Sequence, residues 1–189
     1  MTETPNPNIV DADTLTGEMH PIRRCVLSIG SNLGDRVATL QGAVNALADT
    51  PEVWLTAVSS VYETEPLEAP DGSQDFLNAV VLADTSLSAR TLLERALAIE
   101  DAYGRERTTE SGAPRTLDVD LIVVGDRRAN DDDLVLPHPK AHERAFVLTP
   151  WHEIEPDAEL PGHGPVADLL QKVAEQEVVV RGDLGLSLQ

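Results

Sequence analysis

The sequence predicts an α+β protein with a ferredoxin-like sandwich, in which strands and helices follow the order β-α-β-β-α-β and further helices lie toward the C-terminus. Two observations carry this prediction. Strand-like runs of alternating or β-branched residues occur four times, and segments with apolar residues at helical spacing follow the first and third runs. A chain of 189 residues has the length of one domain. We expect a disordered, acidic tail over residues 1–22 and a single domain over residues 23–189.

The predicted strands are residues 24–29, 53–64, 76–83 and 117–124. In the first of them, alternation places Cys25, Leu27 and Ile29 on one side. The chain has one cysteine, so no internal disulfide can form, and we expect this thiol to be a small buried core residue.

The predicted helices follow turn-forming residues. The first begins after residues 30–35, with Ser31 or Asn32 as its cap. The second covers residues 88–103, and shorter helices are expected over residues 140–146 and 166–177.

Charge composition excludes some classes of partner. The chain has 14 Lys and Arg against 33 Asp and Glu, a formal net charge of -19. Such a surface repels nucleic acid and anionic membranes. No run of residues has the length of a membrane-spanning helix, and the N-terminus lacks the pattern of a signal peptide, so we expect a cytoplasmic protein. An anionic substrate would need metal ions or a local patch of cations.

Asp118 and Asp120 are the most informative pair of residues. Two positions apart on a predicted strand, they point to the same face, whereas Leu117, Val119 and Leu121 point to the other. Adjacent carboxylates repel each other unless a cation or a proton lies between them. Mg²⁺ prefers such oxygen ligands and completes its shell with substrate phosphates. A solvated strand end remains the alternative interpretation.

Seven of the 14 positive residues gather in one stretch of the sequence, residues 105–144. Arg suits bidentate phosphate contacts, and Arg115 lies three residues before Asp118. We assign Arg127 and Arg128 to a solvated turn. His138 lies between two prolines that stiffen its backbone, so it could donate to a phosphate, although a loop histidine is more often structural.

Asn78 is predicted to share an apolar strand face with Phe76, Val80 and Leu82. A buried amide needs hydrogen-bond partners. A flat heterocycle would supply them together with a surface for stacking on Phe76, and a neighbouring loop could also satisfy the amide.

Several segments in order resemble the 6-hydroxymethyl-7,8-dihydropterin pyrophosphokinase family, from about Cys25 to about Gly162. The segments that carry the resemblance are Leu27-Ser28-Ile29-Gly30-Ser31-Asn32-Leu33-Gly34-Asp35, Ser59-Ser60-Val61-Tyr62-Glu63-Thr64, Phe76-Leu77-Asn78, Gly104-Arg105, Pro114-Arg115-Thr116-Leu117-Asp118-Val119-Asp120, Pro137-His138-Pro139 and Arg144-Ala145-Phe146-Val147-Leu148. The resemblance implies transfer of diphosphate from ATP to the pterin, with AMP as the second product, in folate biosynthesis. It also implies a ferredoxin-like fold, in agreement with the order of elements.

The resemblance assigns roles to individual residues. Asp118 and Asp120 would hold two Mg²⁺ ions. Catalysis would also involve Arg105, Arg107 and Arg115, with Arg107 in a mobile loop that closes over the substrates. The nucleotide would meet Glu100, Arg105, Arg115, His138 and Arg144, and the pterin would meet Thr64, Leu67, Phe76, Asn78 and Phe146.

One departure and two alternatives qualify these roles. Some family members carry an Arg-Trp pair in the mobile loop, where this chain has Ser111-Gly112. A nucleotidyltransferase would also use paired carboxylates and would release pyrophosphate. A non-catalytic ligand-binding module could share the fold, because this architecture hosts many functions. We expect a monomer that binds ATP and the pterin, and neither nucleic acid nor membrane.

Overall fold

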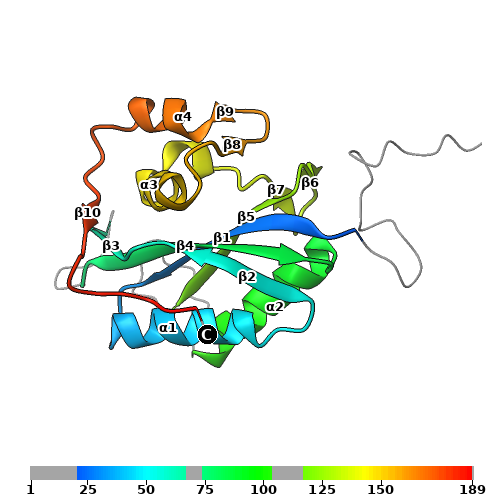
Figure 1. The fold of residues 1–189 in the computed structure, drawn as a ribbon, viewed down its shortest axis with the longest axis horizontal. Helices are drawn as coiled ribbons and strands as arrows, with labels where there is room; N and C mark the ends of the chain where they lie inside the picture. The colour runs from blue at the N-terminus through cyan, green and yellow to red at the C-terminus, as the bar shows by residue number, and fades with distance from the viewer. Residues whose placement is uncertain (1–20, 67–73, 104–116, 189) are drawn as a thin grey trace, which may run out of the picture.

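The computed structural model describes residues 21–66, 74–103 and 117–188. Its centre is an antiparallel sheet with the strand order β10-β3-β4-β1-β5, in which β2 also pairs with β4 (Figure 1). The strands of this sheet are β1 (Arg23–Ser31), β2 (Val53–Val58), β3 (Tyr62–Thr64), β4 (Phe76–Thr85), β5 (Asp118–Val124) and β10 (Val179–Val180). The order β2/β3-β4-β1-β5 is that of a ferredoxin-like sheet, which confirms the predicted fold class.

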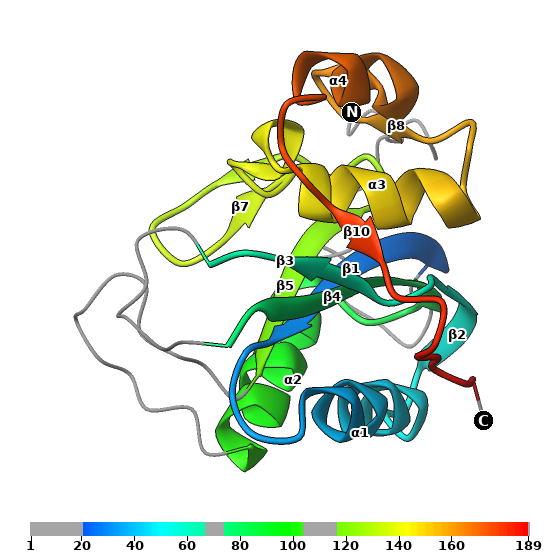
Figure 2. The same cartoon turned by 90° about the vertical axis from the view of Figure 1, so that its left-hand side faces the viewer.

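Helices cover both faces of the sheet. α1 (Arg36–Ala48) and α2 (Ala89–Ala102) lie on one face, and α3 (Ala145–Ile154) and α4 (Val166–Lys172) lie on the other (Figures 1 and 2). The remaining elements are β6 (Ala129–Asn130), β7 (Val135–Leu136), β8 (Glu159–Leu160), β9 (Gly164–Pro165) and the 3₁₀ turn η2 (Ala141–Glu143). Among the described residues, no helix is both long enough and apolar enough to cross a bilayer.

Strand alternation divides the interior into two apolar clusters. In β1, Cys25, Leu27 and Ile29 pack toward α1 and α2, whereas Val26 packs toward α3 together with Trp151. Cys25 is fully buried, as expected, and its burial raises the pKa of the thiol to about 12, so it stays protonated and inert.

The predicted strand over residues 53–64 is wrong in one respect, because the structure divides it into β2 and β3. At the break, the side chain of Ser59 accepts a hydrogen bond from the backbone N–H of Val80 at 2.9 Å. The carboxylate of Glu153 accepts the N–H of Ser60 at 3.1 Å. Side chains therefore replace part of the strand ladder, so the chain can change direction there.

Two other local predictions also differ from the structure. α1 is capped by Asp35, which accepts from the N–H of Ala38 at 3.2 Å, while Ser31 still belongs to β1. The helix expected over residues 140–146 is the short turn η2, and α3, which was not predicted, begins directly after Arg144.

The two tryptophans allow a matched test of the second cluster. Trp151 is 1% exposed and Trp54 is 50% exposed. We expect Trp151→Ala to lower the free energy of unfolding by about 3–5 kcal/mol, because it leaves a large cavity between α3 and the sheet. Trp54→Ala should cost less than about 1 kcal/mol. Urea unfolding followed by circular dichroism measures both, and equal losses would contradict this description of the core.

Candidate active site

Three neighbouring strands change from apolar to polar at the same level of the α3 face. Along β1, Val26 is followed by Ser28 and Gly30 on that face. In the antiparallel register, Ser28 lies opposite Asp120, and Gly30 lies opposite Asp118. Residues opposite each other in a sheet present their side chains to the same face, so these groups lie together.

On the other side of β1, the register with β4 places Gly30 opposite Asn78. A Cβ atom built on Gly30 would lie 3.1 Å from Oδ1 of Asn78 and 3.7 Å from Cδ1 of Phe76. The missing side chain therefore leaves open the space between the Asn78 amide and the Asp118 carboxylate. Gly30 thus forms the floor of a site that these two strands border.

A cavity of about 890 Å³ opens above this floor. It gathers residues from the central strands, from the loop before η2, from the start of α3 and from the chain before β10. The lining residues are Ser28, Gly30, Glu63, Thr64, Glu65, Pro66, Asp75, Phe76, Asn78, Asp118, Asp120, His138, Glu143, Arg144, Phe146, Gln176, Glu177, Val178 and Val179. A volume of this size holds a small organic ligand.

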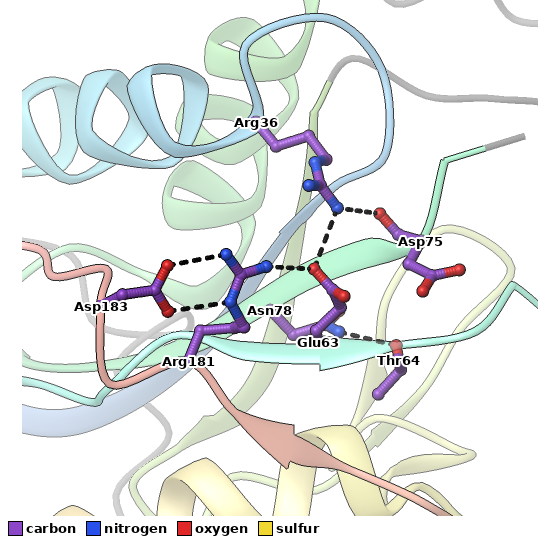
Figure 3. Close-up of polar contacts among 7 residues, drawn as sticks. All are labelled: Arg36, Glu63, Thr64, Asp75, Asn78, Arg181 and Asp183. Atoms are coloured by element: carbon purple, nitrogen blue, oxygen red, sulfur yellow. Dashed lines mark hydrogen bonds and ion pairs between the residues drawn. The ribbon is translucent and has the colours of Figure 1, made fainter.

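Asn78 is 4% exposed and is held by β3. Its Nδ2 donates to Oγ1 of Thr64 at 2.9 Å, because the pairing of β3 with β4 puts Thr64 opposite Phe76 and diagonal to Asn78 on the same face (Figure 3). This contact fixes the orientation of the amide and satisfies one of its two donor hydrogens.

Glu63 connects three separate segments at the edge of the cavity (Figure 3). Its Oε2 accepts from Arg181 at 2.7 Å and from Arg36 at 3.3 Å. Arg36 also donates to the backbone oxygen of Asp75 at 2.8 Å, and Arg181 binds both carboxylate oxygens of Asp183. This polar network ties the start of α1, the sheet edge and the C-terminal segment together beside Thr64.

His138 is a neutral donor at the cavity wall. Burial lowers the pKa of its imidazole to about 4, and the charges of Arg144 and Lys140 act in the same direction. Its Nδ1 accepts the backbone N–H of Lys140 at 3.2 Å, so the single ring proton lies on Nε2. The ring can therefore donate one hydrogen bond at neutral pH without carrying a charge.

Arg144 and Phe146 come from the junction of η2 and α3. The guanidinium carbon of Arg144 lies 5.4 Å from the centroid of the Phe146 ring, a cation–π distance. This contact restrains the guanidinium beside an aromatic surface that also lines the cavity.

The cavity has an excess of negative charge. Among the described lining residues, seven have carboxyl groups and Arg144 is the one permanent cation. Arg36 and Arg181 offset the charge of Glu63. The other carboxylates would repel a polyphosphate unless cations accompany it.

The donor chemistry fits a hard cation. Asp118 and Asp120 are half-buried and line the cavity together. Within the described residues, no cluster of three or more His, Cys, Asp or Glu side chains could hold a metal alone. A cation here would need oxygen ligands from a substrate or from water, which is the usual situation for Mg²⁺ in phosphate-binding sites.

The structure brings together most of the predicted site residues that it describes. They are Thr64, Phe76, Asn78, Asp118, Asp120, His138, Arg144 and Phe146. Glu100 is 2% exposed near the end of α2 and does not line this cavity. The predicted roles of Leu67, Arg105, Arg107 and Arg115 fall on residues outside those that the structure describes.

Sequence reasoning missed other lining residues. Ser28 and Gly30 could have been found by pairing β1 with the strand that carries the two aspartates. Gln176, Glu177, Val178 and Val179 had no recognisable signal, because only the folded chain brings them to the sheet edge.

Comparison with known proteins identifies relatives of this chain. Residues 26–156 match the family model of 7,8-dihydro-6-hydroxymethylpterin-pyrophosphokinase (HPPK). A 2-amino-4-hydroxy-6-hydroxymethyldihydropteridine pyrophosphokinase of Methylorubrum extorquens is 46% identical over 140 residues, covering 74% of this chain and 87% of the relative. The enzyme of that name from Mycobacterium tuberculosis is 41% identical over 173 residues, covering 86% of this chain and 89% of the relative.

The fold recurs in a solved structure. HPPK-DHPS of Plasmodium falciparum, crystallised with pterin and p-hydroxybenzoate, superposes with a TM-score of 0.65 at 14% identity. The superposition covers 84% of this chain and 44% of that one, so this chain spans less than half of the Plasmodium protein. Since the family model covers well over half of the chain and the relatives match over nearly their full length, the chain belongs to the 7,8-dihydro-6-hydroxymethylpterin-pyrophosphokinase family.

Proposed function

We propose that this cavity is the site where the protein transfers diphosphate from ATP to 6-hydroxymethyl-7,8-dihydropterin, with Asp118 and Asp120 as ligands of two Mg²⁺ ions. The observation that carries this proposal is the shared floor at Gly30, which separates a fixed amide on one strand from two carboxylates on another. A pterin at the Asn78 side and a triphosphate at the Asp118 side would meet above that floor.

Binding and orientation account for most of what this chain contributes. The pterin hydroxymethyl oxygen attacks the β-phosphorus of ATP, the bond from that phosphorus to the oxygen of the α-phosphate breaks, and AMP leaves. Bound Mg²⁺ would supply charge neutralisation for the phosphates. Holding the two reactants in line within one cavity lowers the entropic part of the barrier, so no covalent enzyme intermediate is needed.

His138 and Arg144 are the described residues that favour nucleotide binding at the Asp118 side of the cavity. Arg144 provides a charged donor and His138 a neutral one, and both line the cavity. We retain Arg105, Arg107 and Arg115 as proposed phosphate contacts, because the described lining is too acidic to bind a triphosphate unaided. Glu100 is retained as a proposed nucleotide contact on the family resemblance alone.

The pterin end is supported by Thr64, Phe76, Asn78 and Phe146, with Leu67 retained from the resemblance. Asn78 uses one amide hydrogen on Thr64 and keeps hydrogen-bonding capacity for a heterocycle. The two phenylalanines offer apolar surface for a flat ring.

Composition supports the remaining parts of the proposal. A net charge of -19 disfavours nucleic acid as a partner. A lone buried thiol, Cys25, suits a reducing cytoplasm. We also propose that the protein is a monomer.

Nucleotide analysis tests the reaction directly. Incubation of the protein with ATP, Mg²⁺ and 6-hydroxymethyl-7,8-dihydropterin should give AMP and the pterin diphosphate in equal amounts. Release of pyrophosphate would indicate a nucleotidyltransferase, and the absence of pterin-dependent turnover would indicate a binding module. Either result would reject the proposed reaction.

The paired aspartates should matter for rate rather than for folding. We expect Asp118→Asn and Asp120→Asn each to lower turnover by about two to four orders of magnitude, since each removes a charged ligand from the metal clamp. Their melting temperatures without Mg²⁺ should equal or slightly exceed that of the wild type, because one of two repelling charges is lost. Early melting with near-normal turnover would instead show a structural ion-pair role. Asp132→Asn, at an exposed turn, is the control.

Asn78 should contribute to pterin affinity. We expect Asn78→Ala to weaken the binding of a pterin analogue by about 1–3 kcal/mol, because a buried hydrogen-bonding partner is lost. Calorimetric titration of the folded variant measures the effect, with the exposed Asn130→Ala as control. Unchanged affinity in Asn78→Ala would refute the assigned pterin pocket.

A further inference from the structure

Residues 176–188 form a strap across the edge of the sheet, beyond the stretch that the family model matches. After α4 the strap runs beside β3 through β10 and continues toward α1 (Figures 1 and 2). Val179 pairs with Glu63 in the sheet. At the far end, the side chain of Gln41 exchanges two hydrogen bonds with the backbone of Ser187, both 2.9 Å long. The strap is therefore anchored to the sheet and to α1.

Gln176, the first residue of the strap, contacts the backbone on both sides of Arg144. Its Oε1 accepts from the N–H of Ala145 at 3.0 Å, and its Nε2 donates to the carbonyl oxygen of Glu143 at 2.7 Å. An N–H needs the amide oxygen and a carbonyl needs the amide nitrogen, so the two contacts together define the orientation of the Gln176 amide.

The start of α3 depends on this contact for a side-chain cap. Arg144 precedes the first helical residue and makes no capping hydrogen bond. The first N–H groups of a helix lack intrahelical partners, and Gln176 supplies one for Ala145 from 31 residues away. Arg144 has an extended backbone with φ -115° and ψ 105°, so it links two helical segments and belongs to neither.

Arg144 and Phe146 differ in what holds them. Phe146 lies inside α3, whose next residues, Val147 and Leu148, are buried in the second apolar cluster. Arg144 lies outside the helix, between the two backbone groups that bind the Gln176 side chain. A change at Gln176 should therefore move the guanidinium more than the aromatic ring.

We propose that Gln176 is a positioning residue for the nucleotide half of the site, which holds Arg144 where its guanidinium meets the triphosphate. This inference rests on the proposed function, because it assumes that Arg144 contacts ATP. The strap keeps Gln176 in place, since beyond β10 the side chain of Arg181 binds Glu63 at 2.7 Å and also binds Asp183 (Figure 3).

Two substitutions distinguish a role of Gln176 in positioning Arg144 from a role in capping α3. Gln176→Met keeps the length of the side chain and removes both hydrogen bonds. We expect it to raise the KM for MgATP about tenfold, as the loss of one well-placed contact would, and to change the KM for the pterin less than about twofold. Gln176→Glu retains the acceptor for Ala145 and loses the donor to Glu143. It should still show a raised KM for MgATP, and Gln176→Met, which adds no charge, distinguishes the lost contact from repulsion between a new carboxylate and the nucleotide.

Binding measurements in the full chain complete the test. Calorimetric titration with Mg²⁺ and a nonhydrolysable ATP analogue should show the same weakening in Gln176→Met. When Arg144→Ala is already present, adding Gln176→Met should weaken analogue binding by less than about twofold, because Gln176 acts through Arg144. Gln171→Ala, an exposed glutamine on α4, is the matched control and should bind as the wild type does.

The inference is overturned by a normal KM for MgATP in Gln176→Met, by a normal KM in Gln176→Glu, or by losses that add fully in the double variant. Wild-type protein that forms no AMP would reject the proposed function instead. These failures are distinguishable, because AMP formation is measured on the unaltered chain and the positioning effect is measured between variants.

Discussion

β1 lies between β4 and β5, and its antiparallel register brings Gly30 level with Asn78 on one side and with Asp118 on the other. Each of the three strands is apolar on the α3 face farther along, where Val26, Val80 and Ile122 pack in one cluster. The strand pairing that forms the second apolar cluster therefore also forms the floor of the site. A slip of one residue in β1 would turn both sets of side chains to the opposite face.

Charge sets the second constraint on the site. Seven of the 19 described lining residues carry carboxyl groups and one is a permanent cation, whereas ATP is a polyanion. A neutral His138 and one restrained Arg144 can orient phosphates but cannot offset that charge alone. Cations bound with the nucleotide would offset this charge, and two half-buried aspartates on one strand face offer the oxygen ligands that such cations prefer. The proposed dependence on metal thus rests on the electrostatics of the cavity wall as well as on the proposed ligands, Asp118 and Asp120.

The sequence predicted the features that depend on local pattern. Alternation in residues 117–124 placed Asp118 and Asp120 on one face, and the structure confirms that Val119 and Leu121 pack on the other. Alternation also placed Asn78 correctly among apolar neighbours. Both predictions depend on strand geometry alone, which a short stretch of sequence specifies.

Features that depend on distant contacts were missed. The break at Ser59 requires Val80, and the backbone of Arg144 is bracketed by a side chain 31 residues from Ala145. The strap contributes cavity wall although residues 176–179 carry no motif. Such contacts follow from the packing of the whole chain, and no periodicity in one segment encodes them. The predicted arginine contacts at positions 105, 107 and 115 stay predictions.

The position of the metal ions tests the central claim most directly. Crystals of the protein with Mn²⁺ in place of Mg²⁺, a nonhydrolysable ATP analogue and the pterin would show the ions by anomalous diffraction. The account predicts two anomalous peaks, both ligated by the carboxylates of Asp118 and Asp120 and by phosphate oxygens of the nucleotide. Bound nucleotide with its metal ions held by other carboxylates, such as those of Glu63 and Asp75, would contradict it.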